Sequence, residues 1–291
     1  MKSFELLYQF MDNFAFLVLS AVGLAIIFGM MGIINLAHGE FIMLGAYTAS
    51  IAVMNGVPFI LAIVLSVLVV GLIGFIIDKL IISRLYGRTI DSVVVTFGIS
   101  MVLGQLMLIV FGPSMQSPAT PLGAVTIFGS SYSVYRICLF FVAIFILIFI
   151  YWLFMHTRFG LLSRATIQKN DIAKSLGVNT EKYYSLTFVL GSALAGLTGA
   201  LYAATMTVSP TFGNGFLTPS FVTVIVGGAN ALIGTVMSGT MLGIVNTGVD
   251  YIWGTLYGRL GLLVVTILVI RLLPLGLSGY VESKFLKVRG K

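Results

Sequence analysis

Long apolar runs, interrupted by short polar or glycine-rich segments, dominate the sequence. A run such as "FAFLVLSAVGLAIIFGMMGII" (14–34) reaches the roughly 20 apolar residues that a helix needs to cross a bilayer. The alternation of apolar and polar residues that is typical of a transmembrane β-barrel is absent. The pattern therefore predicts an all-α, polytopic helical membrane protein. The expected spans lie near 14–34, 40–54, 57–77, 92–111, 137–155, 185–204 and 259–273, with a glycine-interrupted apolar region at 220–249.

The interrupted region 220–249 is resolved by the placement of basic residues. Most Lys and Arg lie in the segments 78–91, 156–184 and from 271 onward, which marks these segments as cytoplasmic. An even number of crossings must then separate residue 184 from the C-terminal tail. We therefore expect two short pieces, "FVTVIVGG" and "TVMSGTMLGIVNTGV", joined at "GANALIG", which gives about 8–9 membrane segments in all and an outward-facing N-terminus.

Composition supports a single transmembrane domain over residues 1–291, with a cytoplasmic loop at 156–184. Hydrophobic residues make up 59% of the chain and charged residues 9%, whereas soluble domains carry about 25% charged residues. The net charge of +7 is explained by topology, so we expect no nucleic-acid partner. Cys138 is the single cysteine, which excludes an intrachain disulfide.

The segments on the expected outer side, 112–133 and 206–219, contain no charged residue. Proline, glycine and hydroxyl residues predict ordered surface loops there. They serve either as plain connectors or as a docking rim for a partner.

The cytoplasmic loop contains a short predicted helix. Asn170 or Asp171 is expected to cap it, and Gly177 is expected to end it. Ala173 and Leu176 give the helix a small apolar face. Because so short a helix does not form alone, it packs either on its own transmembrane bundle or in a groove of a separate cytoplasmic subunit.

The stretch "NLAHGE" places Asn35, His38 and Glu40 in an apolar setting. Ionisable groups there are costly and point to a functional site. A break at Gly39 would let all three side chains turn inward. They form a local hydrogen-bonded knot between helix ends, line a translocation pathway, or relay protons. No nucleophile or metal-ligand set accompanies them, so we expect neither an enzyme nor a metal site.

Five motifs together resemble one family. They are "INLAHGEFIMLGAY", "TRFGLLSRATIQKNDIAKSLGVNT", "TFVLGSALAGLTGALYA", "GGANALIGT" and "LPLGLSG". In order and spacing, they are similar to permease subunits of ATP-binding-cassette (ABC) importers for branched-chain amino acids and urea. The resemblance implies a multi-pass protein of the bacterial cytoplasmic membrane, with two permeases forming the pore. It also implies two ATPase subunits inside and a soluble solute-binding protein outside. A related second permease, giving a heterodimer, is favoured over a homodimer.

The resemblance also assigns roles to residues in the cytoplasmic loop. Ile172 to Gly177 match the coupling helix that docks on the ATPase, and Arg164 and Ala165 lead into it. The residues expected to couple to the ATPase are Arg164, Ala165, Asp171, Ile172, Ala173, Leu176 and Gly177. The chain lacks the G-x-x-x-x-G-K-S/T motif, so Mg-ATP is expected on the partner subunits and no cofactor on this chain.

The solute is less determined than the architecture. A zwitterionic amino acid needs partners for both charges, whereas urea needs only hydrogen bonds. Side chains that could supply them are those of Asn35, Thr96, Asn230 and Asn246. Together with local similarity to the urea branch, this favours urea or a short amide, with branched-chain amino acids as the alternative. The expected pathway residues are Asn35, His38, Glu40, Thr96 and Asn230, and the expected mechanism is ATP-driven alternating access. A stand-alone small-solute channel is the further alternative, and an intramembrane enzyme would need a product that depends on His38 or Glu40.

Overall fold

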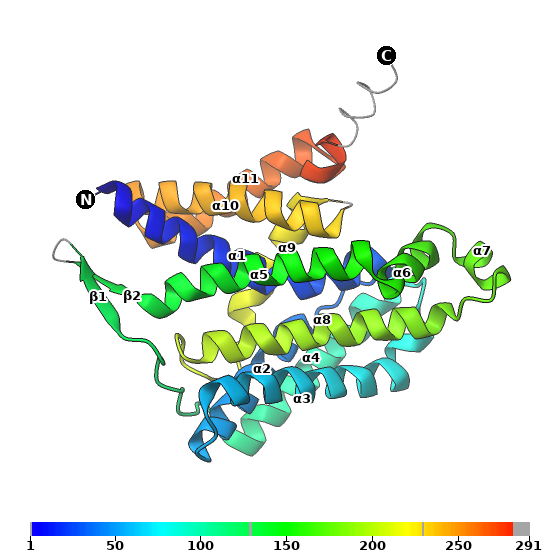
Figure 1. Ribbon diagram of the computed structural model, residues 1–291, viewed down its shortest axis with the longest axis horizontal. Helices are drawn as coiled ribbons and strands as arrows, with labels where there is room; N and C mark the ends of the chain where they lie inside the picture. The colour runs from blue at the N-terminus through cyan, green and yellow to red at the C-terminus, as the bar shows by residue number, and fades with distance from the viewer. Residues whose placement is uncertain (1, 128–129, 229, 282–291) are drawn as a thin grey trace. The chain divides into compact units, whose positions relative to one another are not determined.

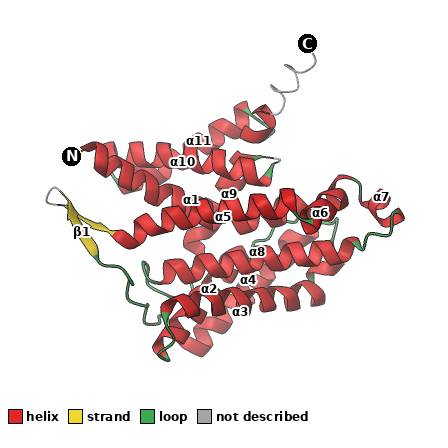
Figure 2. Cartoon of the chain, viewed as in Figure 1, coloured by secondary structure: helices red, strands yellow, loops and turns green. Residues whose placement is uncertain are grey.

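The computed structural model describes residues 2–127, 130–228 and 230–281, and helices dominate it (Figures 1 and 2). Seven helices within the described ranges are long and apolar enough to cross a membrane. They are α1 (Lys2–Met31), α3 (Phe59–Leu80), α4 (Thr89–Phe111), α5 (Val134–His156), α8 (Thr180–Ala203), α10 (Ala231–Trp253) and α11 (Thr255–Leu272). The shorter apolar helix α9 (Asn214–Gly227) and the 17-residue helix α2 (His38–Met54) accompany them. The predicted all-α polytopic membrane fold is confirmed.

The remaining elements lie in the connections. They are the 3-10 turn η1 (Ile82–Leu85), the helices α6 (Arg158–Gln168) and α7 (Asn170–Ser175), and an antiparallel hairpin of β1 (Ala124–Ile127) and β2 (Ser130–Ser133). The sequence reading of 112–133 as loop was wrong over the hairpin, whose register pairs Ala124 with Ser133.

Helix boundaries follow the apolar runs with one large exception. The expected break within 220–249 is confirmed, because α9 ends at Gly227 and α10 begins at Ala231. The second piece is longer than expected, since α10 continues to Trp253 and is long enough to cross a membrane. Gly228 lies between them with a φ of +85°, a left-handed conformation that glycine adopts without strain. The first helix is the exception. It begins at Lys2 instead of residue 14, because the polar residues that precede the apolar span are also helical.

The chain forms two compact units that are discontinuous in sequence. One unit comprises residues 1–22, 122–147 and 219–291, and the other comprises 23–121 and 148–218. We call them the first and second unit and describe each by itself.

Helix α8 packs against α2 and α3 in the second unit through glycine contacts. A Cβ atom added at Gly45 of α2 would meet the Gly196 backbone of α8, and one at Gly199 would meet the Ile42 carbonyl oxygen of α2. On the α3 side, a Cβ at Gly74 would lie 2.5 Å from the Ser192 side chain. The small residues of 191–204 therefore serve close helix packing, as their four-residue spacing predicts.

An apolar core holds the first unit together. It consists of Leu17 from α1, Val222 and Val226 from α9, Leu242 from α10, and Leu262 and Val269 from α11. In addition, Ser220 Oγ donates a 2.8 Å hydrogen bond to the Ser20 carbonyl oxygen, which links α9 to α1.

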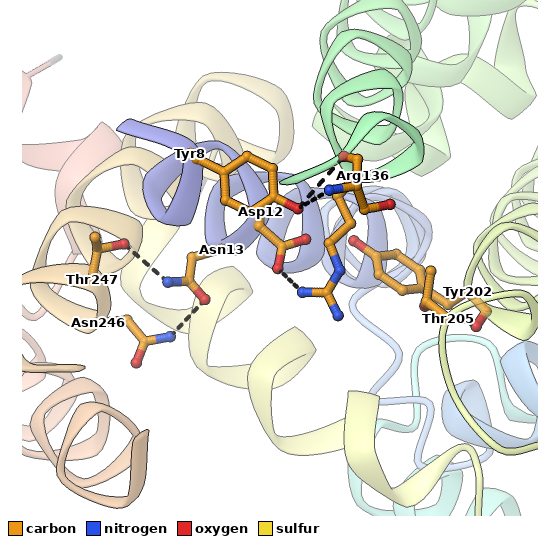
Figure 3. A network of polar contacts seen from close by, with 9 residues as sticks. Tyr8, Asp12, Asn13, Arg136, Tyr202, Thr205, Asn246 and Thr247 are labelled. Carbon is orange, nitrogen blue, oxygen red and sulfur yellow. Dashed lines mark hydrogen bonds and ion pairs between the residues drawn. The ribbon is translucent and has the colours of Figure 1, made fainter. Parts of the chain in front are cut away.

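A polar network also joins helices of the first unit (Figure 3). Asn13 of α1 donates through Nδ2 to Thr247 Oγ1 at 2.9 Å and accepts through Oδ1 from Asn246 Nδ2 at 3.1 Å, both on α10. The neighbouring Asp12 forms an ion pair with Arg136 of α5. Because α1 bonds to α5 and α10 with neighbouring side chains, its polar N-terminal turns belong to the bundle.

Candidate functional site

The polar stretch of residues 35–40 lies at a break between two helices. Helix α1 ends at Met31, Gly32 has a φ of +65°, and α2 begins only at His38. A break inside an apolar bundle frees backbone groups that need new partners. Thr96 of α4 supplies one, because its hydroxyl accepts a 3.1 Å hydrogen bond from the Leu36 N–H. The same hydroxyl lies 2.6 Å from the Ser92 carbonyl oxygen, to which it donates.

Asn35 is fully buried within the break. Its side-chain Oδ1 accepts a 3.1 Å hydrogen bond from the Ala37 N–H, and its carbonyl oxygen accepts from the His38 N–H at 3.3 Å. These bonds shape the turn that starts α2. Its Nδ2 is a buried donor with no hydrogen-bond partner among the described residues.

His38 and Glu40 are both buried but are directed toward different helices. Ser100 Oγ of α4 donates a 2.8 Å hydrogen bond to Glu40 Oε1. Glu40 Oε2 is buried and has no hydrogen-bond partner in the described part of the chain. The His38 ring packs toward α1, because a Cβ added at Gly23 would lie 3.2 Å from its Cε1 atom. The Glu40 carboxylate thus faces α4 through Oε1, and the His38 imidazole faces α1.

Two sequence expectations need correction at this site. The chain does not break at Gly39, which lies in the first turn of α2 and packs on the backbone of Gly213, with 2.8 Å between an added Cβ and the Gly213 carbonyl oxygen. Sequence reasoning also missed Ser100. The spacing of Ser100 from Thr96 could have indicated it. The two residues are four positions apart on an apolar helix, which places both hydroxyls on one face.

Asn230 belongs to the first unit, whereas the other pathway candidates belong to the second. Its Oδ1 accepts a 3.3 Å hydrogen bond from the Ile233 N–H and so caps α10. Its own N–H donates to Ser278 Oγ at 3.1 Å, a residue that sequence reasoning had not considered. The side chain of Asn230 is therefore engaged at the α9–α10 break.

The segment 156–184, which the sequence predicts to be a cytoplasmic loop, contains two helices where one was predicted. Thr157 caps α6, since its Oγ1 accepts from the Gly160 N–H at 3.2 Å. Arg164 lies along α6, where Nε donates to the Gly160 carbonyl oxygen at 3.3 Å, and Ala165 is half-buried. The predicted cap of α7 was wrong: its N-cap residue is Lys169, and neither Asn170 nor Asp171 caps it.

The end of α7 agrees with prediction. Gly177 has a φ of +82°, its N–H donates to the Lys174 carbonyl oxygen at 2.9 Å, and the Val178 N–H donates to the Ala173 carbonyl oxygen at 3.0 Å. These two bonds form a Schellman motif, which satisfies carbonyl groups at the end of a helix.

The apolar side chains of α7 divide between the protein and solvent. Ala173 is 3% exposed and packs inward, whereas Ile172 is 57% and Leu176 78% exposed. The adjacent α6 adds the exposed Leu161 and Ile167, and Asp171 is exposed beside them. The predicted apolar face of Ala173 and Leu176 is therefore split, and the outer part is free to contact another molecule.

The fold and these two regions define a class of protein. A multi-pass bundle with broken helices, buried polar groups at a break and an exposed helix pair in a basic loop has the architecture of a membrane transport protein.

Comparison with known proteins gives the family. The model of the family described as branched-chain amino acid transport system / permease component matches residues 6–273, so the chain belongs to that family of ABC importer permeases. It is 28% identical to the high-affinity branched-chain amino acid transport system permease protein BraD of Pseudomonas aeruginosa, over 91% of this chain and 92% of that protein. It is 28% identical to the probable permease LivH of Methanocaldococcus jannaschii, over 93% and 90%. Against LivH of Escherichia coli it is 25% identical, over 91% of each chain.

No solved structure matches the chain. The three relatives carry branched-chain amino acid names, so the sequence-based preference for urea gains no support from them.

Proposed function

We propose that this chain moves a branched-chain amino acid across the bacterial cytoplasmic membrane as one of two permeases that form the importer pore. The observation that carries this proposal is the family match over residues 6–273, together with relatives named for these amino acids across nine-tenths of their length. It replaces urea, the solute favoured from the sequence, with the alternative.

The α1–α2 break suits a zwitterionic solute. A free amino acid presents an ammonium group and a carboxylate, each of which needs a partner on leaving water. Among the described residues, Glu40 Oε2 is an acceptor without a partner, available to the ammonium group, and Asn35 Nδ2 is a donor without a partner, available to the carboxylate. The positive end of the α2 dipole also favours an anionic group there. Thr96 and His38 complete the pathway in this unit, and Asn230 contributes at the α9–α10 break.

The α6–α7 segment is the proposed contact with an ATPase subunit. Ile172 and Leu176 offer apolar surface, and Lys174 beside them is exposed and basic. Arg164, Ala165, Asp171, Ala173 and Gly177 hold or flank this surface. A short helix that presents apolar anchors fits a groove in a partner protein. Two ATPase subunits would bind Mg-ATP, a second related permease would complete the pore, and a soluble binding protein would deliver the solute from outside.

The burial of the pathway residues supports alternating access as the mechanism. Asn35 is 0% and Glu40 6% exposed, so solute reaches them only after the helices around the break move. ATP-driven closure of the ATPase subunits would supply that movement through α7. A shift between states requires contacts that differ between them, and we expect Asn35 and Glu40 to be hydrated in one state and sealed in the other.

The test is uptake by the complete importer reconstituted in liposomes. Labelled leucine and labelled urea are offered with and without ATP, using the native chain and a variant in which residues 171–177 are scrambled. We expect ATP-dependent leucine uptake that the scrambled variant loses.

The other outcomes are equally informative. Urea uptake without leucine uptake would keep the architecture and overturn the proposed solute. Uptake that ignores both ATP and the scrambled helix would identify a channel and refute the importer.

A further inference from the structure

Helix α7 has too little structure of its own to hold a fixed position. It has six residues, no side-chain cap at its N-terminus, and buries only Ala173 among its well-exposed side chains. A helix of this length is unstable alone in water. The Schellman motif at Gly177 orders its end but does not attach it to the membrane helices. Another contact must fix α7 if movement of α7 is to move the bundle.

The structure contains such a contact at the start of α7. Asn170 Nδ2 donates a 3.0 Å hydrogen bond to the Tyr184 hydroxyl, one turn into the long helix α8. The Tyr184 ring packs against the Tyr86 ring, with 5.0 Å between centroids and planes inclined by 59°. Tilted aromatic pairs at this distance are attractive. One side chain of α7 is thereby joined to α8 and to the connector that follows α3.

The chain of contacts continues to a buried acid. The Tyr86 hydroxyl donates a 2.7 Å hydrogen bond to Asp78 Oδ1, in the last turn of α3. Asp78 is fully buried. Its Oδ2 has no hydrogen-bond partner in the ranges that the structure describes, so the side chain of Asp78 depends on the bond from Tyr86 to Oδ1. Burial, reinforced by the adjacent acid, raises the pKa of the Tyr86 hydroxyl far above its usual value, which keeps it protonated and able to donate.

We propose that Asn170, Tyr184, Tyr86 and Asp78 form a coupling bridge that transmits displacement of α7 to α8 and α3. This inference rests on the proposed function, because it gives the docking helix a mechanical route into the bundle. All four residues belong to the second unit, and α8 and α3 pack closely through Gly74 and Ser192. The bridge therefore ends in rigid, glycine-packed helices. Its members are positioning residues, since none of them contacts the proposed solute site.

The bridge makes a specific prediction for hydroxyl removal. Tyr184→Phe keeps the ring pair but removes the acceptor for Asn170, and Tyr86→Phe keeps the ring pair but removes the donor to Asp78. We expect each variant to hydrolyse ATP while taking up roughly three- to tenfold less solute per ATP, the range that loss of one hydrogen bond produces. Tyr183→Phe is the matched control, because Tyr183 adjoins Tyr184 on α8 but packs on Phe159.

A double-mutant cycle tests whether two members act as a unit. Asn170→Ala and Tyr184→Phe remove opposite ends of one hydrogen bond, so the double variant should lose little more coupling than either single variant. Losses that multiply would show that the two residues act separately and would overturn the bridge. A loss in Tyr183→Phe as large as in Tyr184→Phe would overturn it too.

A measurement without transport separates this inference from the proposed function. In the Cys138→Ser importer, nitroxide labels at Lys174 of α7 and Leu72 of α3, both exposed, report the distance between these helices by electron paramagnetic resonance. We expect one narrow distribution, which widens in Tyr184→Phe and Tyr86→Phe and stays narrow in Tyr183→Phe. Unchanged distributions in the first two variants would refute the bridge. An importer that transports neither solute while the distributions widen as expected would refute the proposed function and leave the bridge standing.

Discussion

The closest helix contact in the second unit gives the sharpest stability prediction. Gly199 of α8 faces the backbone of α2, so the added Cβ of Gly199→Ala would overlap the Ile42 carbonyl oxygen and lie 2.8 Å from the Ala46 nitrogen. Both are backbone atoms, and no side-chain rotation relieves the overlap. Helices α2 and α8 must move apart instead. A gap of 0.5–1 Å forfeits about a quarter to a half of the dispersion energy between the atoms that face each other.

The size of the effect follows from two opposing terms. Overpacking of a well-packed interface costs typically about 1–3 kcal/mol, and contact with backbone places this site at about 3 kcal/mol. Replacing glycine by alanine inside a helix stabilises the helix by about 1 kcal/mol. We therefore expect Gly199→Ala to lose about 2 kcal/mol of stability. Gly104→Ala on α4 is the matched control, because a Cβ there meets nothing within 4 Å, and it should gain up to about 1 kcal/mol.

The assay is thermal melting of the purified importer in detergent, followed by size-exclusion chromatography of the soluble fraction after heating. A difference of about 3 kcal/mol between the two variants should separate their midpoints by roughly 5 °C or more. Equal midpoints for Gly199→Ala and Gly104→Ala would show that α2 and α8 are not packed backbone to backbone, and would refute the reasoning.

Three further substitutions test separate parts of the structure. Asn13→Ala removes two hydrogen bonds and leaves Asn246 and Thr247 without that partner, so the melting midpoint should fall by an amount equivalent to about 1–2 kcal/mol. Gly177→Ala forces a side chain into a left-handed conformation at a cost of about 1–2 kcal/mol. Because the short helix α7 can unfold locally to relieve this strain, uptake per ATP should fall while the melting midpoint of the bundle hardly changes. Glu40→Gln removes the proposed partner of the ammonium group, and leucine uptake should fall at least tenfold, by roughly 1.4 kcal/mol or more, with ATP hydrolysis retained.

Each of these predictions has a contrary outcome. An unchanged midpoint in Asn13→Ala would mean that the α1–α10 network is replaced by water. Full coupling in Gly177→Ala would separate the shape of α7 from transport. Normal leucine uptake by Glu40→Gln would remove Glu40 from the solute pathway.

The helices of this protein are predictable from its sequence because the bilayer sets a simple rule. A span of about 20 apolar residues is visible without knowledge of its neighbours, and even the α9–α10 break follows from glycine content and the placement of basic loops. The error at the start of α1 has a physical cause. Asp12 and Asn13 are polar, and only their partners Arg136 and Thr247, distant in sequence, make them compatible with a helix inside the bundle.

The candidate site was predictable in its residue types but not in its geometry. The position of Asn35, His38 and Glu40 in an apolar region marked the site. Their division between α1 and α4 depends on Gly23 and Ser100, which pattern alone does not connect to them. Long-range pairs of this kind lie outside the reach of helical periodicity, which relates residues three or four positions apart.

The buried polar atoms at the α1–α2 break affect how solute binding would shift the equilibrium between conformational states of the transporter. A buried donor or acceptor without a partner costs about 1–3 kcal/mol, and within the described part of the chain Asn35 and Glu40 each carry one such atom. Under the proposed function, a solute that pairs with both atoms removes both costs at once. Even at about 1 kcal/mol each, the solute would bind the paired state roughly 30-fold more tightly than a state that offers neither atom. A protein that satisfied these atoms internally would have no such preference. The incomplete hydrogen bonding of the break is therefore what would allow solute arrival to shift the conformational equilibrium before ATP closes the cytoplasmic side.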